Sequence, residues 1–211
     1  MFFCNKRQRR KEARPSELTT AALALFVEKG FAATRLDDIA ARAGVSKGTL
    51  YLYFDSKEAL FKAVIQEGLV PRLAEAQALA ERHQGSAGEL LQLLLEAWWQ
   101  DIGETPLAGI PKLMVAEARN FPEVAAYYHE KVIFAGRALL GSALQRGMAS
   151  GEFRTLNIDQ CIDLTIAPLL MMVIWRHSLA PCGMAMGEPR ELLRTHLDLL
   201  LHGLQSPENR Q

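Results

Sequence analysis

Residues 30–58 contain helix stop and start signals in quick succession. Gly30 and Gly44 each follow a segment whose apolar residues recur every three or four positions, and glycine ends helices because it adopts left-handed backbone angles at no steric cost. Ser46 can cap a new helix directly after the second stop, and Asp55 can cap the next one. The sequence therefore predicts three short helices joined by tight turns, followed by a long fourth helix.

The remainder of the chain repeats the helical spacing between proline, glycine and asparagine breaks. No segment alternates apolar and polar residues as a half-buried strand does. We therefore predict an all-α fold of about nine helices. The five helices expected after the long fourth helix span residues 87–103, 107–119, 122–150, 158–179 and 188–205.

The charge is zero overall but unevenly distributed. Residues 1–62 carry 12 Lys and Arg against 7 Asp and Glu, whereas residues 63–211 carry 12 against 17. This asymmetry is typical of a polyanion-binding unit attached to a body that does not bind the polyanion. Residues 1–15 are expected to form a flexible basic arm, with Ser16 capping the first helix. Such an arm either enters a DNA minor groove or serves as a solubilising tail, and both interpretations remain open.

Two short helices joined by a glycine turn form either a piece of a helical core or a helix-turn-helix that places its second helix in the DNA major groove. The predicted third helix is rich in hydrogen-bond donors, which favours DNA. Base reading is assigned to Lys47, Thr49 and Tyr51, and phosphate contacts at the two sides to Thr34 and Lys57. The expected DNA-binding residues are Thr34, Arg35, Ser46, Lys47, Gly48, Thr49, Tyr51, Tyr53 and Lys57.

Residues 26–61, with the sequence FVEKGFAATRLDDIAARAGVSKGTLYLYFDSKEALF, closely resemble the TetR/AcrR family of one-component repressors. Tyr53 stands where many relatives carry histidine. The resemblance implies a DNA-binding domain over residues 16–75 with its helix-turn-helix at 35–54, and a helical effector-binding and dimerisation domain over 76–208. It also implies a homodimeric repressor that a small-molecule effector releases from double-stranded operator DNA.

The larger domain offers candidates for both of its implied roles. We expect a largely apolar effector to contact Trp98, Ile102, Met114, Phe134, Met171 and Trp175. We expect the dimer interface at Ile166, Leu170, Val173, Leu193, Leu197, Leu200 and Leu204. Residues of both kinds also commonly fill the core of their own chain.

Gly68 and Pro71 lie within the predicted fourth helix. They either bend it, which would couple effector binding to the recognition helix, or simply break it. Pro168 likewise either kinks a cavity wall or only shapes the packing of its helix.

The sequence indicates no catalytic or metal site and no cofactor. His129-Glu130 begins like a zinc-protease motif, but the position of the second histidine is Ile133. The apolar run at 166–175 is shorter than a membrane-spanning helix requires, and no secretory signal is evident, so we expect a cytoplasmic protein without a membrane partner. The competing hypothesis is a helical enzyme or carrier whose N-terminal unit serves only for protein contact.

Overall fold

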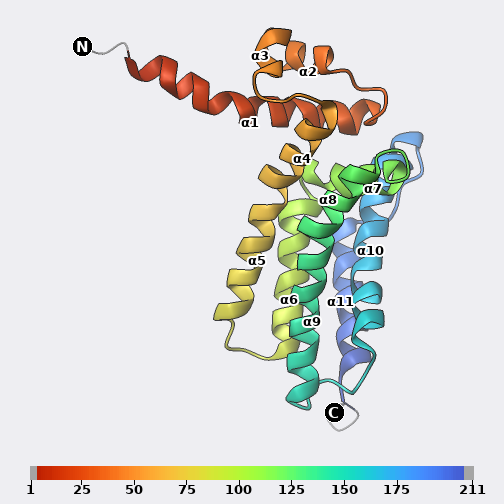
Figure 1. Cartoon of the computed structure of the whole chain (residues 1–211). Helices are drawn as coiled ribbons and strands as arrows, with labels where there is room; N and C mark the ends of the chain where they lie inside the picture. The colour runs from red at the N-terminus through yellow and green to blue at the C-terminus, as the bar shows by residue number, and fades with distance from the viewer. Residues whose placement is uncertain (1–3, 207–211) are drawn as a thin grey trace.

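The structure is a computed structural model that describes residues 4–206, with side chains from residue 15 onward. Four helices form a small head above a helical body (Figure 1). The described residues contain no named strand, and a single isolated antiparallel bridge pairs Phe153 with Gln205. The predicted all-α fold is confirmed.

Most helices begin and end near the breaks that the sequence predicts. The head contains α1 (Cys4–Lys29), α2 (Leu36–Arg42), α3 (Lys47–Tyr51) and α4 (Lys57–Gly68). The body contains α5 (Val70–Arg82), α6 (Ala87–Trp98), α7 (Gly109–Glu117), α8 (Pro122–Tyr128), α9 (Phe134–Ala149), α10 (Ile158–Ser178) and α11 (Pro189–Leu204).

Eleven labels arise from nine predicted segments because two of those segments are divided. The predicted helix at 122–150 comprises α8, a π-helical turn (His129–Ile133) and α9. The predicted long fourth helix is interrupted at Leu69, which separates α4 from α5. Pro71, in the first turn of α5, has no N–H to continue the hydrogen-bond ladder of α4.

The first helix differs from the sequence prediction. Helix α1 begins at Cys4 rather than at Ser16, and Pro15 lies inside it. The Ser16 carbonyl accepts hydrogen bonds from the hydroxyls of Thr19 and Thr20 at 3.0 and 2.8 Å. Ser16 is therefore an internal helical residue, and the flexible arm expected over residues 1–15 is helical from Cys4 onward.

Three aromatic rings form the centre of the head core. Phe26 of α1, Phe31 after α1 and Phe61 of α4 are buried, with ring centroids 5.0 to 5.2 Å apart. The Phe121 ring, which precedes α8 in the body, packs edge-on against Phe31 at 4.4 Å. One apolar cluster continues from these rings into the body through Ile110 and other side chains of α7. The head is thus packed firmly on the upper end of the body.

Helix α10 is the one described helix that is long and apolar enough to span a membrane by length and composition, because the run at 166–175 is part of a 21-residue helix. Leu169 and Val173 are buried in the body core, together with Leu193 and Leu197 of α11. Helix α10 thus contributes one face to the core and leaves another face outside it.

Candidate nucleic-acid interface and ligand cavity

Helices α2 and α3 are held in a compact helix-turn-helix. Gly44 has a φ of +65° in the turn, as the sequence predicts, and the N–H of Val45 bonds to the Ala40 carbonyl at 3.0 Å. The Ser46 hydroxyl accepts a hydrogen bond from the N–H of Thr49 at 3.1 Å and so caps α3. Leu50 is fully buried and anchors α3 to the head core. The opposite face of α3 therefore points outward.

The outward face of α3 presents the predicted base-reading side chains. Lys47 is exposed, its ammonium lies 2.9 Å from the Asp37 carboxylate of α2, and that hydrogen-bonded pairing raises the Lys47 pKa. The same ammonium lies over the Tyr51 ring at 5.9 Å from its centroid. Thr49 and Ser46 share a hydroxyl contact of 2.8 Å. These exposed groups can exchange their present partners for bases and phosphates at little cost.

Four further residues complete this surface. Arg35 precedes α2 and is exposed, and Gly48 has only the Ser46 hydroxyl oxygen near the position that a Cβ would take, 3.9 Å away. Tyr53 is partly buried and packs against the head core. Leu52 was not predicted, yet 82% of it is exposed beside Tyr51. The only signal for Leu52 in the sequence is its place between Tyr51 and Tyr53.

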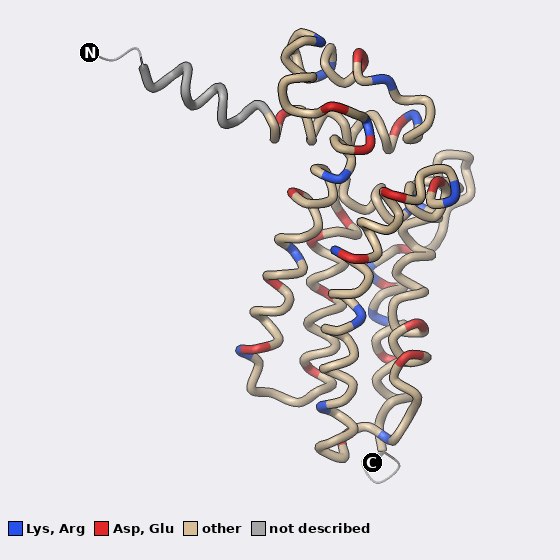
Figure 2. Tube along the Cα trace, in the orientation of Figure 1, with Lys and Arg blue, Asp and Glu red and all other residues tan. Residues whose placement is uncertain are grey.

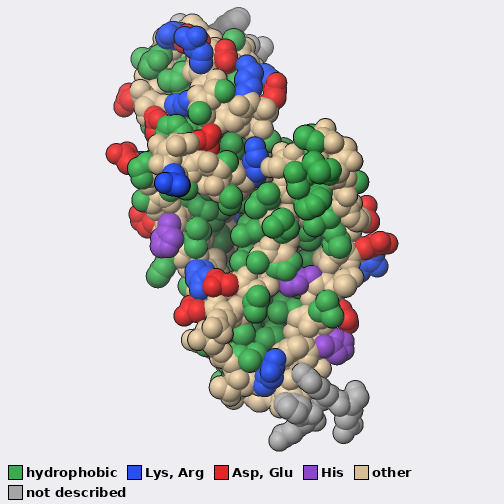
Figure 3. Space-filling model, turned by 90° about the vertical axis from the view of Figure 1, so that its right-hand side faces the viewer, with side chains coloured by type: hydrophobic (Ala, Val, Ile, Leu, Met, Phe, Trp, Pro, Cys, Tyr) green, Lys and Arg blue, Asp and Glu red, His purple; other side chains and the backbone are tan. Residues whose placement is uncertain are grey.

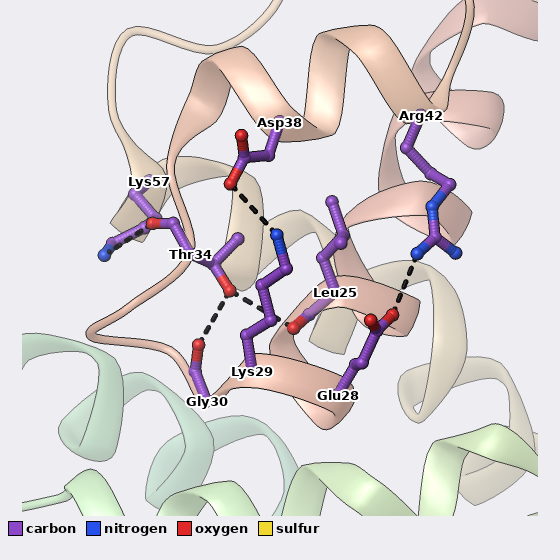
Figure 4. A network of polar contacts seen from close by, with 8 residues as sticks. All are labelled: Leu25, Glu28, Lys29, Gly30, Thr34, Asp38, Arg42 and Lys57. Atoms are coloured by element: carbon purple, nitrogen blue, oxygen red, sulfur yellow. Dashed lines mark hydrogen bonds and ion pairs between the residues drawn. The ribbon is translucent and has the colours of Figure 1, made fainter.

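Thr34 is not a surface residue, contrary to the prediction that it contacts phosphate. Its side chain is buried, and its hydroxyl donates to the carbonyl oxygens of Gly30 at 2.7 Å and Leu25 at 3.2 Å (Figure 4). The N-cap of α2 is Arg35, whose side chain makes no capping hydrogen bond. Thr34 instead fastens the loop to the C-terminal end of α1, since Leu25 lies in the last turns of that helix and Gly30 directly follows it.

Lys57 is partly buried, and its side chain fastens the loop before α2. Its ammonium donates to the carbonyl oxygens of Phe31, Ala32 and Thr34 at 2.6, 3.0 and 3.0 Å. Figure 4 shows the Lys57 side chain reaching the loop at Thr34. An ammonium group has three N–H donors, so these carbonyls occupy all of them. The cap of α4 is Ser56, one residue after the predicted Asp55.

Basic and acidic residues are interspersed along the described part of the head (Figure 2). Three exposed ion pairs join Lys29 to Asp38, Arg42 to Glu28 and Lys47 to Asp37. Residues 15–62 contain six basic and six acidic residues, so the whole excess of five positive charges in residues 1–62 belongs to residues 1–14. The side chains of that basic segment lie outside the described ones.

The body encloses a cavity of about 680 Å³ between α5, α6 and the helices from α7 to α10. Its wall is mainly apolar and includes three predicted effector contacts, Trp98, Ile102 and Met114. Helix α5 has no buried residue and contributes Leu73, Ala76 and other side chains to this wall. Because such a cavity matches small-ligand sites in size and lining, it is the candidate effector site.

The other three predicted effector contacts are not among the residues that line the cavity. Phe134 is 68% exposed and Met171 is 49% exposed. The Trp175 indole N–H donates to the Met184 carbonyl at 2.6 Å. Sequence reasoning also missed two polar residues of the wall, Asp101 and Tyr128, because a polar side chain in a helical sequence is normally read as surface.

The predicted dimer residues are mostly internal to one chain. Val173, Leu193, Leu197 and Leu204 are buried in the body core, Leu200 packs against that core, and Ile166 and Leu170 line the cavity. The two predicted helices nevertheless present other apolar residues, with Leu164, Met171 and Leu199 exposed by 69%, 49% and 68%. Figure 3 shows a broad hydrophobic area over this side of the body.

The described residues contain no group of three His, Cys, Asp or Glu side chains that could hold a metal ion. Cys161 is buried and Cys182 is exposed, and both are free thiols.

Family models match both parts of the chain. A model described as bacterial regulatory proteins of the tetR family matches residues 18–64, and a tetracyclin repressor-like C-terminal domain model matches residues 82–182.

Two curated regulators and a solved structure agree with these matches. The chain is 32% identical over 150 residues to the uncharacterized HTH-type transcriptional regulator YfiR of Bacillus subtilis, covering 70% of this chain and 71% of YfiR. It is 43% identical over 158 residues to the HTH-type transcriptional regulator RutR of Escherichia coli O157:H7, covering 74% of this chain and 61% of RutR. The structure of the regulator FadR from Bacillus subtilis in complex with stearoyl-CoA superposes with a TM-score of 0.73 at 21% identity, covering 90% and 99% of the two chains.

Proposed function

Because the chain belongs to the tetR family of bacterial regulatory proteins, it is a DNA-binding transcriptional regulator, and we propose that it is a homodimeric cytoplasmic repressor released from its operator by a small effector. The observation that carries this proposal is the apolar cluster shared by the head and the cavity wall. Ile102 and Met114 line the cavity and belong to the same cluster as Phe26 and Phe31 of the head.

The proposed DNA contact places α3 in the major groove of each operator half-site. Lys47, Thr49 and Tyr51 read base edges, while Gly48 allows the backbone to approach closely. Arg35, Ser46 and Tyr53 take phosphate contacts, and Leu52 adds an apolar contact that suits a thymine methyl group. The exposure of Lys47, Tyr51 and Leu52 on one surface supports this set. Thr34 and Lys57 serve the set indirectly, since they hold the loop before α2.

The proposed dimer interface uses the outer faces of α10 and α11. Exposed Leu164, Met171 and Leu199 would cost free energy in a monomer, since each square ångström of apolar surface kept from water contributes roughly 25 cal/mol. A two-fold axis at this face would present two copies of α3 to a pseudo-palindromic operator.

The proposed release mechanism operates through α5 and α4. Leu69 lines the cavity, and its N–H bonds to the Ile65 carbonyl of α4 at 2.9 Å. A ligand that packs against the cavity side of α5 would therefore shift the C-terminal end of α4. Helix α4 also carries Phe61, which is buried in the head core. To release the operator nearly completely, the effector must favour the released conformer by about 10⁴-fold.

The test is to sequence the genomic fragments that the purified protein retains and then to measure affinity for one fragment against salt concentration. A DNA reader loses roughly 0.9 log units of affinity per log unit of salt for each phosphate neutralised. We expect the affinity to fall steeply as the salt concentration rises. Deletion of residues 1–12, which carry most of the excess positive charge, should make this fall shallower. No retained fragments, or binding that salt does not weaken, would favour the enzyme or carrier alternative.

A further inference from the structure

We infer that the effector is an organic cation with an apolar body, whose positively charged nitrogen is held by Asp101, Trp98 and Tyr128 in the body cavity. The inference rests on the proposed effector role of this cavity and adds the chemical class of the ligand. It depends on three polar groups that line the cavity and have no side-chain partner in the described part of the chain.

Asp101 brings a carboxylate to an otherwise apolar wall. It lies in the π-helical turn Trp99–Gly103 that follows α6, and it lines the cavity between Trp98 and Ile102. Its backbone carbonyl accepts the Thr105 hydroxyl at 3.1 Å, but no described side chain pairs with its carboxylate. A carboxylate that faces an apolar cavity without a partner is costly, and a ligand cation removes that cost.

The two aromatic residues suit the same cation. Trp98 lies three positions before Asp101 and lines the same cavity, so the indole and the carboxylate are neighbours on the wall. Tyr128 enters from the end of α8, and its burial raises the phenol pKa to about 12, so it stays neutral. Neither the Trp98 N–H nor the Tyr128 hydroxyl has a hydrogen-bond partner among the described residues. Aromatic faces attract organic cations, most strongly when water is excluded.

The remaining charges of the wall are mostly paired. Arg72 contacts Glu75 at 3.1 Å on α5. Arg137 of α9 binds two carboxylates of α10, Asp159 and Asp163, of which Asp163 lines the cavity. Arg82, the one wall arginine without a partner among the described residues, is exposed at the last residue of α5. Helix α6 begins beyond that end of α5 and runs back along it (Figure 1), and Asp101 follows the far end of α6.

The test compares three probes of equal chain length and different charge: decylamine, decanol and decanoate, each below its micellar concentration. Binding to the full-length protein is measured by calorimetry and by the tryptophan fluorescence that Trp98 contributes. We expect decylamine to bind at least about tenfold more tightly than decanol or decanoate. The variant Asp101→Asn should reduce this preference to about twofold while it retains decanol affinity. The matched control Glu96→Gln, which removes a carboxylate of α6 that does not line the cavity, should leave the preference unchanged.

Three results would overturn the inference, and they are distinguishable from one another. If decanoate or decanol binds as tightly as decylamine, the cavity is an effector site for a different ligand class, and only the inference fails. If none of the three probes binds, or if decylamine binds without weakening operator affinity, the proposed effector role of the cavity fails as well. An unchanged decylamine preference in Asp101→Asn would also contradict the assigned carboxylate.

Discussion

The ammonium of Lys57 lies 2.6 Å from the carbonyl oxygen of Phe31, so a side chain from the first turn of α4 fastens the loop between α1 and α2. The same ammonium lies 4.7 Å from the centroid of the Phe31 ring. Phe31 in turn packs against Phe121 of the body. Lys57 therefore stabilises the point at which the helix-turn-helix, α4 and the body meet.

Replacement of Lys57 by methionine should destabilise the protein by about 2 kcal/mol, because three loop carbonyls lose a charged donor. Urea unfolding measures this loss. The control Lys62→Met, in which a lysine 4.0 Å from Glu123 is removed from the same helix, should cost at most about 0.5 kcal/mol. A phosphate role predicts the reverse: normal stability and a salt slope shallower by about 0.9. That pattern would restore Lys57 to the DNA interface.

A glutamate at Leu164 or Leu199 should convert the dimer to monomer, because it places a charge in the proposed apolar interface. Light scattering measures the molar mass directly. The control Leu93→Glu alters a leucine of α6 that is 40% exposed, and it should remain dimeric. Dimers in both interface variants would place the two-fold contact elsewhere on the body.

Filling the cavity should separate DNA binding from effector response. Ala76 lines the cavity from α5, so Ala76→Trp should occupy ligand volume and lower effector affinity by tenfold or more, while operator binding persists. Ala74 of the same helix is exposed, and Ala74→Trp should respond to effector normally. Operator release by effector, followed by fluorescence anisotropy, compares the two. An equal response in both variants would show that the effector does not use this cavity.

Acid should destabilise the protein partly through His177. Burial, with Arg176 and Lys112 nearby, lowers the pKa of His177 below 6.5, and its Nε2 is buried without a partner among the described residues. The unfolded chain therefore takes up this proton at a higher pH than the folded chain does, so stability falls as pH drops through about 6.5. Between about pH 8 and pH 5.5, the melting temperature of the wild type should fall further than that of His177→Gln. An equal fall of the melting temperature in both proteins would contradict this role of His177.

Local signals in the sequence predicted the helices well. Gly30 and Gly44 end helices with positive φ, and Ser46 caps α3 as expected. Such signals act within a few residues, so they can be recognised without knowledge of the fold. The extension of α1 through Pro15 was missed because a proline lowers helix preference without forbidding a helix, and no Ser, Thr, Asp or Asn precedes Cys4 in the sequence.

Assignments that depend on distant partners were less predictable. The donors of Thr34 and Lys57 suit phosphate, but in the fold they meet backbone carbonyls that only tertiary structure brings within reach. Helix α10 is apolar on nearly all sides, so its sequence did not distinguish Ile166, which lines the cavity, from the exposed Met171. Asp101 resembled a surface carboxylate, and only the fold places it in the cavity wall.

The most direct test of α3 as the recognition helix is the affinity of Lys47→Ala and Tyr51→Ala for an operator duplex. This affinity is measured by fluorescence anisotropy at a fixed salt concentration. Each lost contact should weaken binding by about 1–3 kcal/mol while molar mass and melting temperature stay at wild-type values. Lys131, an exposed lysine of the body paired with Glu130, provides the matched control, and Lys131→Ala should bind normally. Wild-type affinity in both α3 variants would contradict the assignment of α3 as the recognition helix.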